Sequence, residues 1–422
     1  MGRNLTPSGR RRDHNEGMPC RIEPTPHAAT PHASPLPAAL EWIAADLERL
    51  AADGLERPHR IRDGRQGAAI ELDGRRLVNL GSNDYLGYAG DVRLTKAASK
   101  AACAEGFGAG ASPLVSGHSR SHERLERAIA DLLDVPEAIS FASGFAANSA
   151  TIAALVGPGD VIASAERNHA SIIDGCRLSR ADVLVYPHRD VAGAARILAG
   201  ARAARRRLVV TDTLFSMEGT IAPLADLCAV ARRHEAMLLV DEAHATGVFG
   251  PRGSGLVEAA GCADGIHIRT GTLSKALGAA GGFVAGHADL IRWLRHRARA
   301  WIFSTAHPPA VAAAATRGIE LVAAEPHRRV ELLAAAATFR QRLAARGLDL
   351  GGAEAQIVPI VAGAAEAAVA LSARLAEAGF FVPAIRPPSV PPGRSLVRAS
   401  LSWLHTDSDL TRLADALVSC RP

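Results

Sequence analysis

The segment "LVVTDTLFSMEGTIAPLADLCAVARRHEAMLLVDEA" (208–243) decides the fold class of this 422-residue chain. It contains two short apolar runs, 208–213 and 237–243, and between them the stretch "PLADLCAVARRHE", whose apolar residues recur at helical spacing. A strand, a helix and a second strand in this order form a unit in which the two strands run parallel. The segment therefore predicts an α/β protein whose helices pack on a parallel sheet.

Five further apolar runs extend this pattern, and helical stretches separate most of them. The runs are 138–143, 161–164, 183–186, 266–272 and 282–286. Together they predict a mainly parallel seven-stranded sheet with helices on both faces. After about residue 310 the pattern changes to long Ala-rich helices and three apolar segments, which predicts a smaller C-terminal α+β domain.

The composition shifts along the chain predict four parts. Residues 1–37 are rich in Pro, Arg and His without apolar periodicity, so we expect a disordered tail. Residues 38–75 read as an N-terminal helix that stops at Gly54, followed by a hairpin arm with a tight turn at Asp73-Gly74. We expect the large, ligand-binding domain at 76–310 and the small C-terminal domain at 311–422.

Composition also excludes several classes of function. Hydrophobic residues make up 48% of the chain and charged residues 22%, but no apolar run approaches the roughly 20 residues that a membrane helix needs. The net charge is +5 and the basic residues are dispersed, so we expect no nucleic-acid partner. The six cysteines are scattered without a CxxC pair, which favours free thiols in the cytoplasm over a disulfide framework or a metal site.

Polar and small residues gather where the predicted strands end. Because ligands of such sheets bind at the carboxyl ends of the strands, we expect these residues to lie at one edge. They are Asp241, His244, Asp212, Ser216, Thr272, Ser274, Lys275, Gly144, Phe145 and His169.

This set of residues suits pyridoxal phosphate. Only three of the 48 Lys and Arg residues are lysine, and Lys275 stands alone in the small-residue segment "RTGTLSKALGAAGGF" (269–283). A lysine amine forms a Schiff base with the cofactor aldehyde, and an arginine, permanently protonated, does not. A carboxylate such as Asp241 would keep the pyridine nitrogen protonated, and His169 would stack on the ring. Gly144 and Phe145 at a helix N-terminus, with the hydroxyls of Thr272 and Ser274, would hold the phosphate.

Each signal taken singly has a simpler interpretation. Lys275 could be a solvated surface residue, Asp241 could cap a helix, and the two histidines could be ordinary core or surface residues. The letters "DEAH" also occur in helicases, but the chain has no GxxxxGK[ST] phosphate loop to accompany them. The order and the placement of the signals together favour a cofactor site.

Nine motifs in one order make the chain resemble the α-oxoamine synthases, a family of fold type I pyridoxal-phosphate enzymes with the aspartate-aminotransferase-like fold. The resemblance runs from about residue 55 to residue 417. The motifs are "SNDYLGY", "LVSGHSRSHERLE", "FASGFAAN", "RNHASIIDG", "DTLFSMEG", "VDEAHATGVFG", "TGTLSKALG", "IFSTAHPPA" and "AIRPPSVPPG". The last motif, "AIRPPSVPPG", is similar to that of the branch that makes 8-amino-7-oxononanoate from L-alanine and a pimeloyl thioester in biotin biosynthesis. Sibling branches make 2-amino-3-oxobutyrate, 5-aminolevulinate or 3-oxosphinganine.

The resemblance also implies a role for individual residues. Lys275 would bind the cofactor aldehyde and remove the substrate α-proton, Asp241 would pair with the pyridine nitrogen, and His244 would bond the ring hydroxyl. Catalysis would rest on Lys275, His169 and Asp241. The implied cofactor-binding residues are Lys275, Gly144, Phe145, His169, Ser216, Asp241, His244 and Thr272, and the implied substrate-binding residues are Arg57, Asn83, His169, Ser389 and Arg398.

The resemblance further implies a homodimer with shared active sites, in which Ser304 and Thr305 reach the neighbouring subunit's phosphate. The acyl carrier would be coenzyme A or an acyl carrier protein. The chain departs from the family pattern at Ser389, where a threonine is common, and at Pro113, where Arg or His is frequent. Two other classes of function stay open from sequence: a binding protein that uses the basic tail, and a catalytically inactive scaffold.

Overall fold

The computed structural model describes residues 36–420, so nearly all of the predicted tail, 1–37, lies outside the described residues. Residues 1–49 and 50–422 form two separate units. A turn η1 (Ala38–Leu40) leads into helix α1 (Glu41–Ala52), most of which belongs to the first unit; this confirms the helix predicted from Leu40. The helix ends before Gly54, whose φ of 64° is the left-handed conformation that glycine adopts readily.

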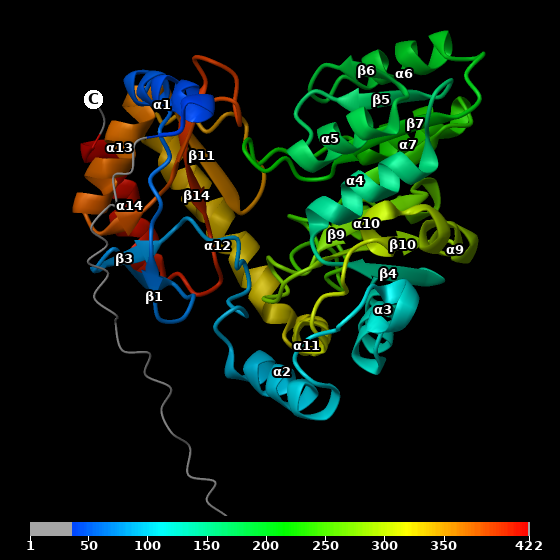
Figure 1. Ribbon diagram of the computed structural model, residues 1–422. Helices are drawn as coiled ribbons and strands as arrows, with labels where there is room; N and C mark the ends of the chain where they lie inside the picture. The colour runs from blue at the N-terminus through cyan, green and yellow to red at the C-terminus, as the bar shows by residue number, and fades with distance from the viewer. Residues whose placement is uncertain (1–35, 421–422) are drawn as a thin grey trace, which may run out of the picture. The chain divides into compact units, whose positions relative to one another are not determined.

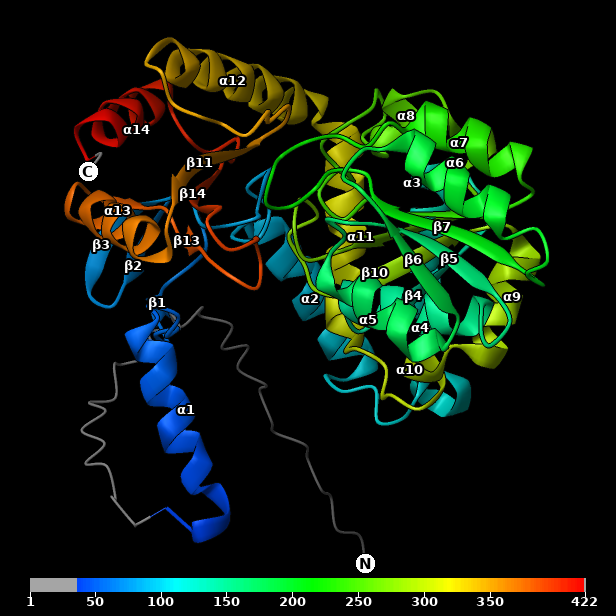
Figure 2. The same ribbon diagram turned by 90° about the horizontal axis from the view of Figure 1, so that it is seen from above.

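A seven-stranded sheet forms the centre of the large domain (Figures 1 and 2). Its strands follow the order β4-β10-β9-β8-β7-β5-β6, and only β10 runs antiparallel to its neighbours. This confirms the predicted mainly parallel sheet of seven strands. The strands are β4 (Glu137–Phe141), β5 (Val161–Ala165), β6 (Asp182–Tyr186), β7 (Arg207–Asp212), β8 (Met237–Asp241), β9 (Ile268–Thr272) and β10 (Gly282–Gly286).

Both faces of the sheet are covered, because successive residues of its central strands enter two different cores. In β7, Leu208 and Val210 join one core and Val209 the other; in β8, Leu239 joins the first core and Leu238 the second. A strand buried on both faces reads as a continuous apolar run, which is the pattern that the sequence shows. Figure 2 shows the two helical layers, α4, α5 and α10 on one face and α6, α7 and α8 on the other.

The helices of the large domain are α2 (Val92–Glu105), α3 (Arg120–Leu133), α4 (Gly144–Leu155), α5 (Ala170–Ser179), α6 (Val191–Gly200), α7 (Leu224–Arg233), α8 (Leu256–Ala259), α9 (Ala288–Arg297), α10 (Arg299–Ile302) and α11 (Pro309–Ala324), with short turns η2 (Pro113–Gly117) and η3 (Ala263–Gly265). Helices α4 to α8 alternate with the strands from β4 to β9, whereas α2 and α3 precede the sheet and α9 to α11 follow it.

The C-terminal part is α+β, as predicted. It contains α12 (Pro326–Ala345), α13 (Ala365–Glu377) and α14 (Asp407–Ser419), with the three-stranded sheet β11-β14-β13 formed by β11 (Ile357–Gly363), β13 (Ala384–Ile385) and β14 (Ser395–Ser400).

The hairpin arm joins this C-terminal part. Strands β1 (Arg62–Asp63), β2 (Ala69–Leu72) and β3 (Arg75–Asn79) continue into β12 (Phe380–Phe381) as a second sheet. Asp73 and Gly74 both have positive φ at the turn between β2 and β3, as the predicted tight turn requires. The domain boundaries at residues 75 and 310 stay predictions.

Two strands end earlier than the sequence runs suggest, and side-chain caps explain both differences. The run 138–143 stops as strand β4 at Phe141, because Ser143 caps helix α4 by accepting a hydrogen bond from the Ala146 N–H. The run 237–243 stops as β8 at Asp241, whose carboxylate accepts from the Ala243 N–H at 2.7 Å. The caps therefore place polar side chains at the strand ends.

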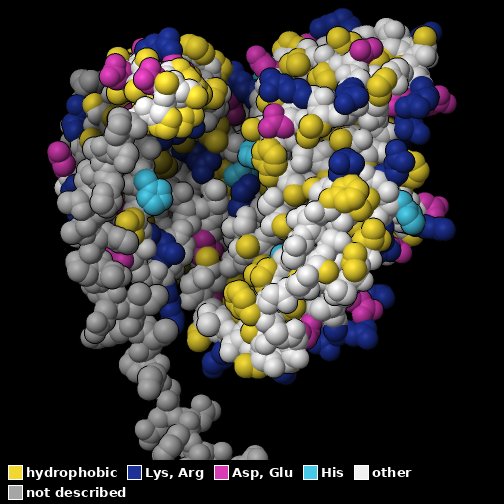
Figure 3. All heavy atoms as spheres, in the orientation of Figure 1, with side chains coloured by type: hydrophobic (Ala, Val, Ile, Leu, Met, Phe, Trp, Pro, Cys, Tyr) yellow, Lys and Arg dark blue, Asp and Glu magenta, His cyan; other side chains and the backbone are white. Residues whose placement is uncertain are grey.

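Between residues 36 and 420, no helix combines the length and apolar character that crossing a bilayer would need. The same part of the chain has no group of three or more His, Cys, Asp or Glu residues that could hold a metal ion. On the face seen in Figure 3, basic side chains are interspersed with acidic ones over the large domain.

Candidate active site

Lys275 begins a chain of hydrogen bonds at the end of strand β9. Its Nζ lies 2.9 Å from Nε2 of His244, and Nδ1 of the same imidazole lies 2.6 Å from the hydroxyl of Tyr85. The Tyr85 hydroxyl in turn donates to Oδ1 of Asn83 at 3.2 Å. Because His244 and Tyr85 are buried, this chain holds the Lys275 amine in one place.

Burial also sets the protonation of this group. It lowers the pKa of Lys275 to about 8, although the carboxylates of Asp241 and Asp212 act in the opposite direction. Burial and the nearby Lys275 and Arg398 hold the pKa of His244 well below its usual range. A neutral His244 can accept from Lys275 at Nε2 and donate from Nδ1 to Tyr85. The amine is thus partly neutral near pH 8, as a nucleophile or base must be.

Asp241 lies at the end of strand β8, and both of its carboxylate oxygens are held. Oδ1 accepts from the Ala243 N–H at 2.7 Å, and Oδ2 accepts from Asn148 Nδ2 at 2.6 Å. The side chain of Asn148 comes from helix α4 and also accepts from the Thr270 hydroxyl at 2.6 Å. Only 4% of Asp241 is exposed, so this carboxylate is fixed and largely shielded from water.

His169 caps the start of helix α5 and is exposed in the site. Its Nδ1 lies 2.7 Å from the Ser171 hydroxyl, and its backbone N–H donates to Asp212 Oδ2 at 2.7 Å. Burial and the neighbouring Asp241 raise the pKa of Asp212 well above its usual range. Burial lowers the pKa of His169, so the imidazole is predominantly neutral at neutral pH.

The N-terminus of helix α4 lies against two hydroxyls. A Cβ atom added to Gly144 would come within 3.3 Å of Thr272 Cβ, so the two residues are in close contact. The hydroxyls of Thr272 and Ser274 are 2.7 Å apart. The first N–H groups of a helix have no intrahelical acceptor, and together with hydroxyl groups they form an anion site.

The amine, the buried carboxylate and this anion site are the three groups that pyridoxal phosphate requires, so the residues fit the cofactor. Phe145, next to Gly144, is 47% exposed to solvent.

Arg398 in strand β14 connects the small domain to this group. Its two terminal nitrogens donate to the Ser216 carbonyl at 2.9 Å and to Asn83 Oδ1 at 2.8 Å. Asn83 also accepts from Tyr85, so Arg398 and Lys275 are the two ends of one hydrogen-bonded chain. Burial lowers the pKa of Arg398, and its Nε has no partner among the described residues. A buried cation with a free donor suits a carboxylate ligand.

Two predicted substrate-binding residues lie apart from this chain. Arg57 and Ser389 are both exposed, and neither hydrogen-bonds the Lys275 group within residues 36–420. They lie on segments that Arg386 joins, because its guanidinium donates to the carbonyls of Gly54 and Glu56 and its own carbonyl accepts from the Ser389 N–H. Arg386 therefore links the two segments that carry Arg57 and Ser389.

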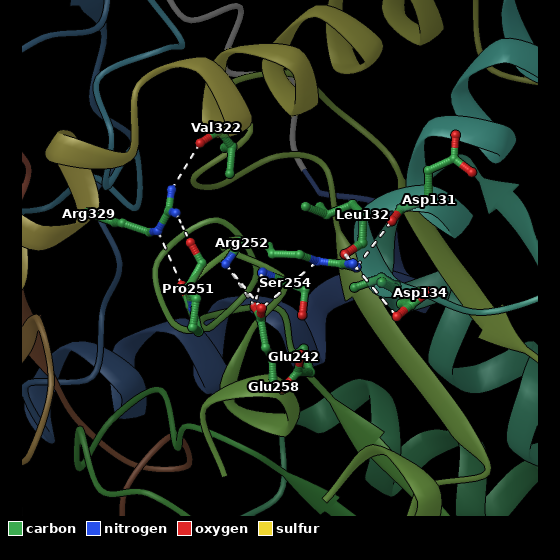
Figure 4. A network of polar contacts seen from close by, with 12 residues as sticks. Asp131, Leu132, Asp134, Glu242, Pro251, Arg252, Ser254, Glu258, Val322 and Arg329 are labelled. Carbon is green, nitrogen blue, oxygen red and sulfur yellow. Dashed lines mark hydrogen bonds and ion pairs between the residues drawn. The ribbon is translucent and has the colours of Figure 1, made fainter. Parts of the chain in front are cut away.

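The turn that follows His244 is braced by two arginines, the exposed Arg252 and the buried Arg329 (Figure 4). Arg252 donates to the Leu132 carbonyl at 2.7 Å, and Arg329 of helix α12 donates to the Val322 and Pro251 carbonyls. Glu242, the second letter of "DEAH", pairs with Arg269 at 2.7 Å inside the protein. Glu242 is therefore a structural residue here, as opposed to a metal ligand of the helicase kind.

Four residues of this arrangement escaped the sequence analysis: Tyr85, Asn148, Ser171 and Gln356, which donates to the His244 carbonyl at 2.9 Å. Tyr85 lies within the quoted motif "SNDYLGY" and Asn148 within "FASGFAAN". The two motifs could therefore have pointed to these residues, but nothing in the sequence identifies their hydrogen-bond partners.

Comparison with known proteins agrees with this geometry. A family model described as aminotransferase class I and II matches residues 75–417. An 8-amino-7-oxononanoate synthase of Anaeromyxobacter dehalogenans (strain 2CP-1) is 48% identical over 384 residues, 91% of this chain and 96% of its own length. That of Geobacter sulfurreducens is 46% identical over 377 residues, 89% and 96% of the two chains.

Solved structures with the same fold include two named enzymes. A serine palmitoyltransferase of Sphingomonas wittichii is 32% identical with a TM-score of 0.86 and covers 92% of this chain and 98% of its own. The 8-amino-7-oxononanoate synthase of Francisella tularensis is 26% identical with a TM-score of 0.71 and covers 81% and 97%. A further match, at 30% identity and a TM-score of 0.86, is described as SPT with a PLP internal aldimine; it covers 92% of this chain and 98% of its own.

The fold and the site thus define a fold type I pyridoxal-phosphate enzyme, as predicted. The chain belongs to the aminotransferase class I and II family and, within it, to the 8-amino-7-oxononanoate synthases. The predicted cofactor and the predicted class, an acyltransferase, are confirmed at the level of the family.

Proposed function

We propose that this chain condenses L-alanine with a pimeloyl thioester, with loss of carbon dioxide, to give 8-amino-7-oxononanoate for biotin biosynthesis. The observation that carries the proposal is the half-buried Lys275 amine, 2.9 Å from His244 Nε2 and under the electrostatic influence of Asp241 and Arg398. An amine, a fixed carboxylate and a buried guanidinium are the groups that the reaction needs.

The residues that would hold pyridoxal phosphate come from the ends of the large-domain strands. Lys275 would take its aldehyde, Asp241 its ring nitrogen, His244 its ring hydroxyl and His169 one face of its ring. The Gly144 and Phe145 N–H groups, with Ser216 and Thr272, would hold its phosphate. When bound, the cofactor supplies an electron sink for the charge left by removal of the substrate α-proton.

Lys275 is the base in this proposal. Its pKa of about 8 leaves a substantial neutral fraction at pH 7 to 8, so Nζ can accept the α-proton of alanine. His244 accepts a hydrogen bond from the resulting ammonium at Nε2 and is itself oriented by Tyr85. The proton held at Nζ is then available for return to the product carbon.

Arg398 would bind the alanine carboxylate. Its guanidinium is 6% exposed, and bonds to Asn83 and the Ser216 carbonyl already fix its orientation. It holds the carboxylate until that group leaves as carbon dioxide. His169, exposed beside Asp241, would contact the same substrate.

The thioester would enter past Arg57 and Ser389. These exposed residues lie on the two segments that Arg386 joins, and Arg57 offers a cation for the distal pimeloyl carboxylate. The carrier would be coenzyme A or an acyl carrier protein.

A homodimer would complete the site. Large apolar side chains are exposed near helices α4, α5 and α10, with Phe303 70%, Leu178 65% and Phe145 47% exposed. A cavity of about 730 Å³ opens on this surface, which also shows yellow patches in Figure 3. Such exposure supports a subunit interface, across which Ser304 and Thr305 would reach the partner subunit's phosphate. The five described cysteines are free, which supports a cytoplasmic location.

A sibling activity is the second candidate, because serine palmitoyltransferase structures match with a TM-score of 0.86. The test is turnover of L-alanine, glycine and L-serine with pimeloyl, acetyl, succinyl and palmitoyl thioesters, with the product identified by mass. We expect 8-amino-7-oxononanoate from alanine and the pimeloyl thioester to form fastest. A higher kcat/KM for any other pair would overturn the proposal in favour of that sibling.

A further inference from the structure

We propose that Asn148 is a positioning residue with two targets: it fixes the carboxylate of Asp241 and, through Ser171, it fixes which nitrogen of His169 carries the proton. The proposal deepens the proposed function, because it rests on the roles given there to Asp241 and His169. It concerns the direction of the hydrogen bonds that link Asp241 to His169 through Asn148 and Ser171.

The amide of Asn148 lies inside the protein between three elements. It is 2% exposed, and its Nδ2 lies 2.6 Å from Asp241 Oδ2 and 2.9 Å from Ser171 Oγ. Its Oδ1 accepts from the Thr270 hydroxyl at 2.6 Å. An ionised carboxylate only accepts, so the amide group that faces Asp241 must be the NH₂ group. The orientation of the amide is therefore determined by its partners.

This orientation determines the next bond as well. The two N–H groups of Asn148 donate to Asp241 and to Ser171 Oγ, so the Ser171 hydroxyl proton is free to donate to His169 Nδ1 at 2.7 Å. The backbone N–H of Ser171 also donates to Nδ1, at 3.3 Å. With two donors directed at Nδ1, this nitrogen must be the acceptor, and the proton of the neutral imidazole sits on Nε2.

The consequence is a defined donor in the open site. His169 presents an Nε2–H group to a bound substrate, whereas Nδ1 is occupied on the protein side. Ser171 and Thr270 are both fully buried, so water does not compete for these bonds. The same amide thus orients both Asp241, which would pair with the cofactor ring nitrogen, and His169, which would stack on the ring.

The tautomer of His169 can be measured without cofactor. Two-bond ¹H–¹⁵N spectra of the ¹⁵N-histidine-labelled apoprotein report which ring nitrogen is protonated, and the His169→Gln variant identifies its signals. We expect a protonated Nε2 and an unprotonated Nδ1 above the pKa of His169, and a mixture of the two forms in Ser171→Ala. A wild-type imidazole protonated at Nδ1 would overturn the proposal, and this result needs no positioning variant to fold.

The second arm measures pyridoxal phosphate affinity by absorbance titration of the apoprotein. Asn148→Ala leaves Asp241 without one partner, so we expect affinity to fall about tenfold and His169 to become a tautomer mixture. Ser171→Ala should keep its affinity within about twofold, because it breaks only the His169 branch. The matched control is Thr151→Val on the same helix, a buried residue whose hydroxyl bonds nothing among the described residues.

Thermal unfolding of each apoprotein checks that the variants fold, and Asn148→Ser replaces Asn148→Ala if that variant does not. A folded Asn148 variant with wild-type affinity and a wild-type tautomer contradicts the proposal. Failure of the wild-type protein to bind pyridoxal phosphate would instead contradict the proposed function, and it would leave the tautomer result of the apoprotein intact.

Discussion

The two sides of the site differ in how strongly the fold determines them. On the cofactor side, Asp241, Asn148 and Arg398 are at most 6% exposed, and each has at least two hydrogen-bond partners. On the entrance side, Arg57 and Ser389 are exposed and make no side-chain hydrogen bond within the described part of the chain. A buried polar group needs its partners whatever the substrate is, whereas an exposed one is free to change. We therefore expect the fold to fix the cofactor chemistry, and exposed residues to carry acyl specificity.

The largest test of this contrast is removal of the amine. Lys275→Ala should lower kcat by at least about 10³-fold, because the base is lost. The measurement is single-turnover formation of product from alanine and the pimeloyl thioester. Lys100→Ala, an exposed lysine on helix α2, is the matched control and should retain full activity. Comparable activity in the two variants would mean that the chemistry lies elsewhere.

Arg398→Leu tests the buried cation. We expect the KM for alanine to rise about 10- to 100-fold, because charge-assisted hydrogen bonds to the substrate carboxylate are lost. Steady-state kinetics with varied alanine measure this change, and the KM for the thioester should change much less. Arg412→Ala, on the surface of helix α14, serves as the control. An unchanged alanine KM would remove Arg398 from the substrate site.

The depressed pKa of Lys275 predicts a pH dependence. Only the neutral amine attacks an aldehyde, and a pKa of about 8 makes it roughly a tenth neutral at pH 7 and nine-tenths neutral at pH 9. The rate of pyridoxal phosphate binding to the apoprotein should therefore rise about tenfold over this range and then level off. Stopped-flow absorbance measures it, and a rate that keeps rising beyond pH 10 would indicate an ordinary lysine.

Tyr85→Phe tests the chain between Lys275 and Arg398. Without the phenol oxygen, Nδ1–H of His244 loses its acceptor, and Nε2 becomes a poorer acceptor for the Lys275 ammonium. We expect kcat to fall up to about tenfold and the rising limb of its pH profile to move to lower pH. A shift to higher pH would show that His244 donates to Lys275 in the native enzyme.

The smallest effect is expected on the entrance side. Ser389→Ala should raise the KM for the pimeloyl thioester about two- to tenfold and leave the pyridoxal phosphate affinity unchanged, since one exposed hydroxyl contributes little. Titration of the apoprotein and steady-state kinetics give the two numbers. Loss of cofactor affinity in this variant would break the contrast between the two sides.

The sequence was sufficient for the sheet and for the residues at its strand ends. All seven large-domain strands were predicted, because strands buried on both faces are continuous apolar runs. Polar residues at the ends of such runs, such as Asp241 and Lys275, could be assigned to one edge of the sheet, because the carboxyl ends of parallel strands meet there.

Sequence could not provide the partners of these residues. Tyr85 and His244 are 159 positions apart, and Asn148 and Asp241 are 93 apart. Asn148 sits among alanines in helix α4, where no periodic pattern marks it, and only the packing of that helix on β8 and β9 gives it a function. The strand ends were also missed by two residues at Ser143 and Ala243, because side-chain caps compete with strand pairing there.

The central claim is that Lys275 is the amine that binds the cofactor. Incubation of the purified protein with pyridoxal phosphate, reduction with borohydride and peptide mass mapping would locate the attached pyridoxyl group. We predict one group per chain, on the peptide that contains Lys275. Attachment at Lys96 or Lys100, or no attachment under saturating cofactor, would contradict this account.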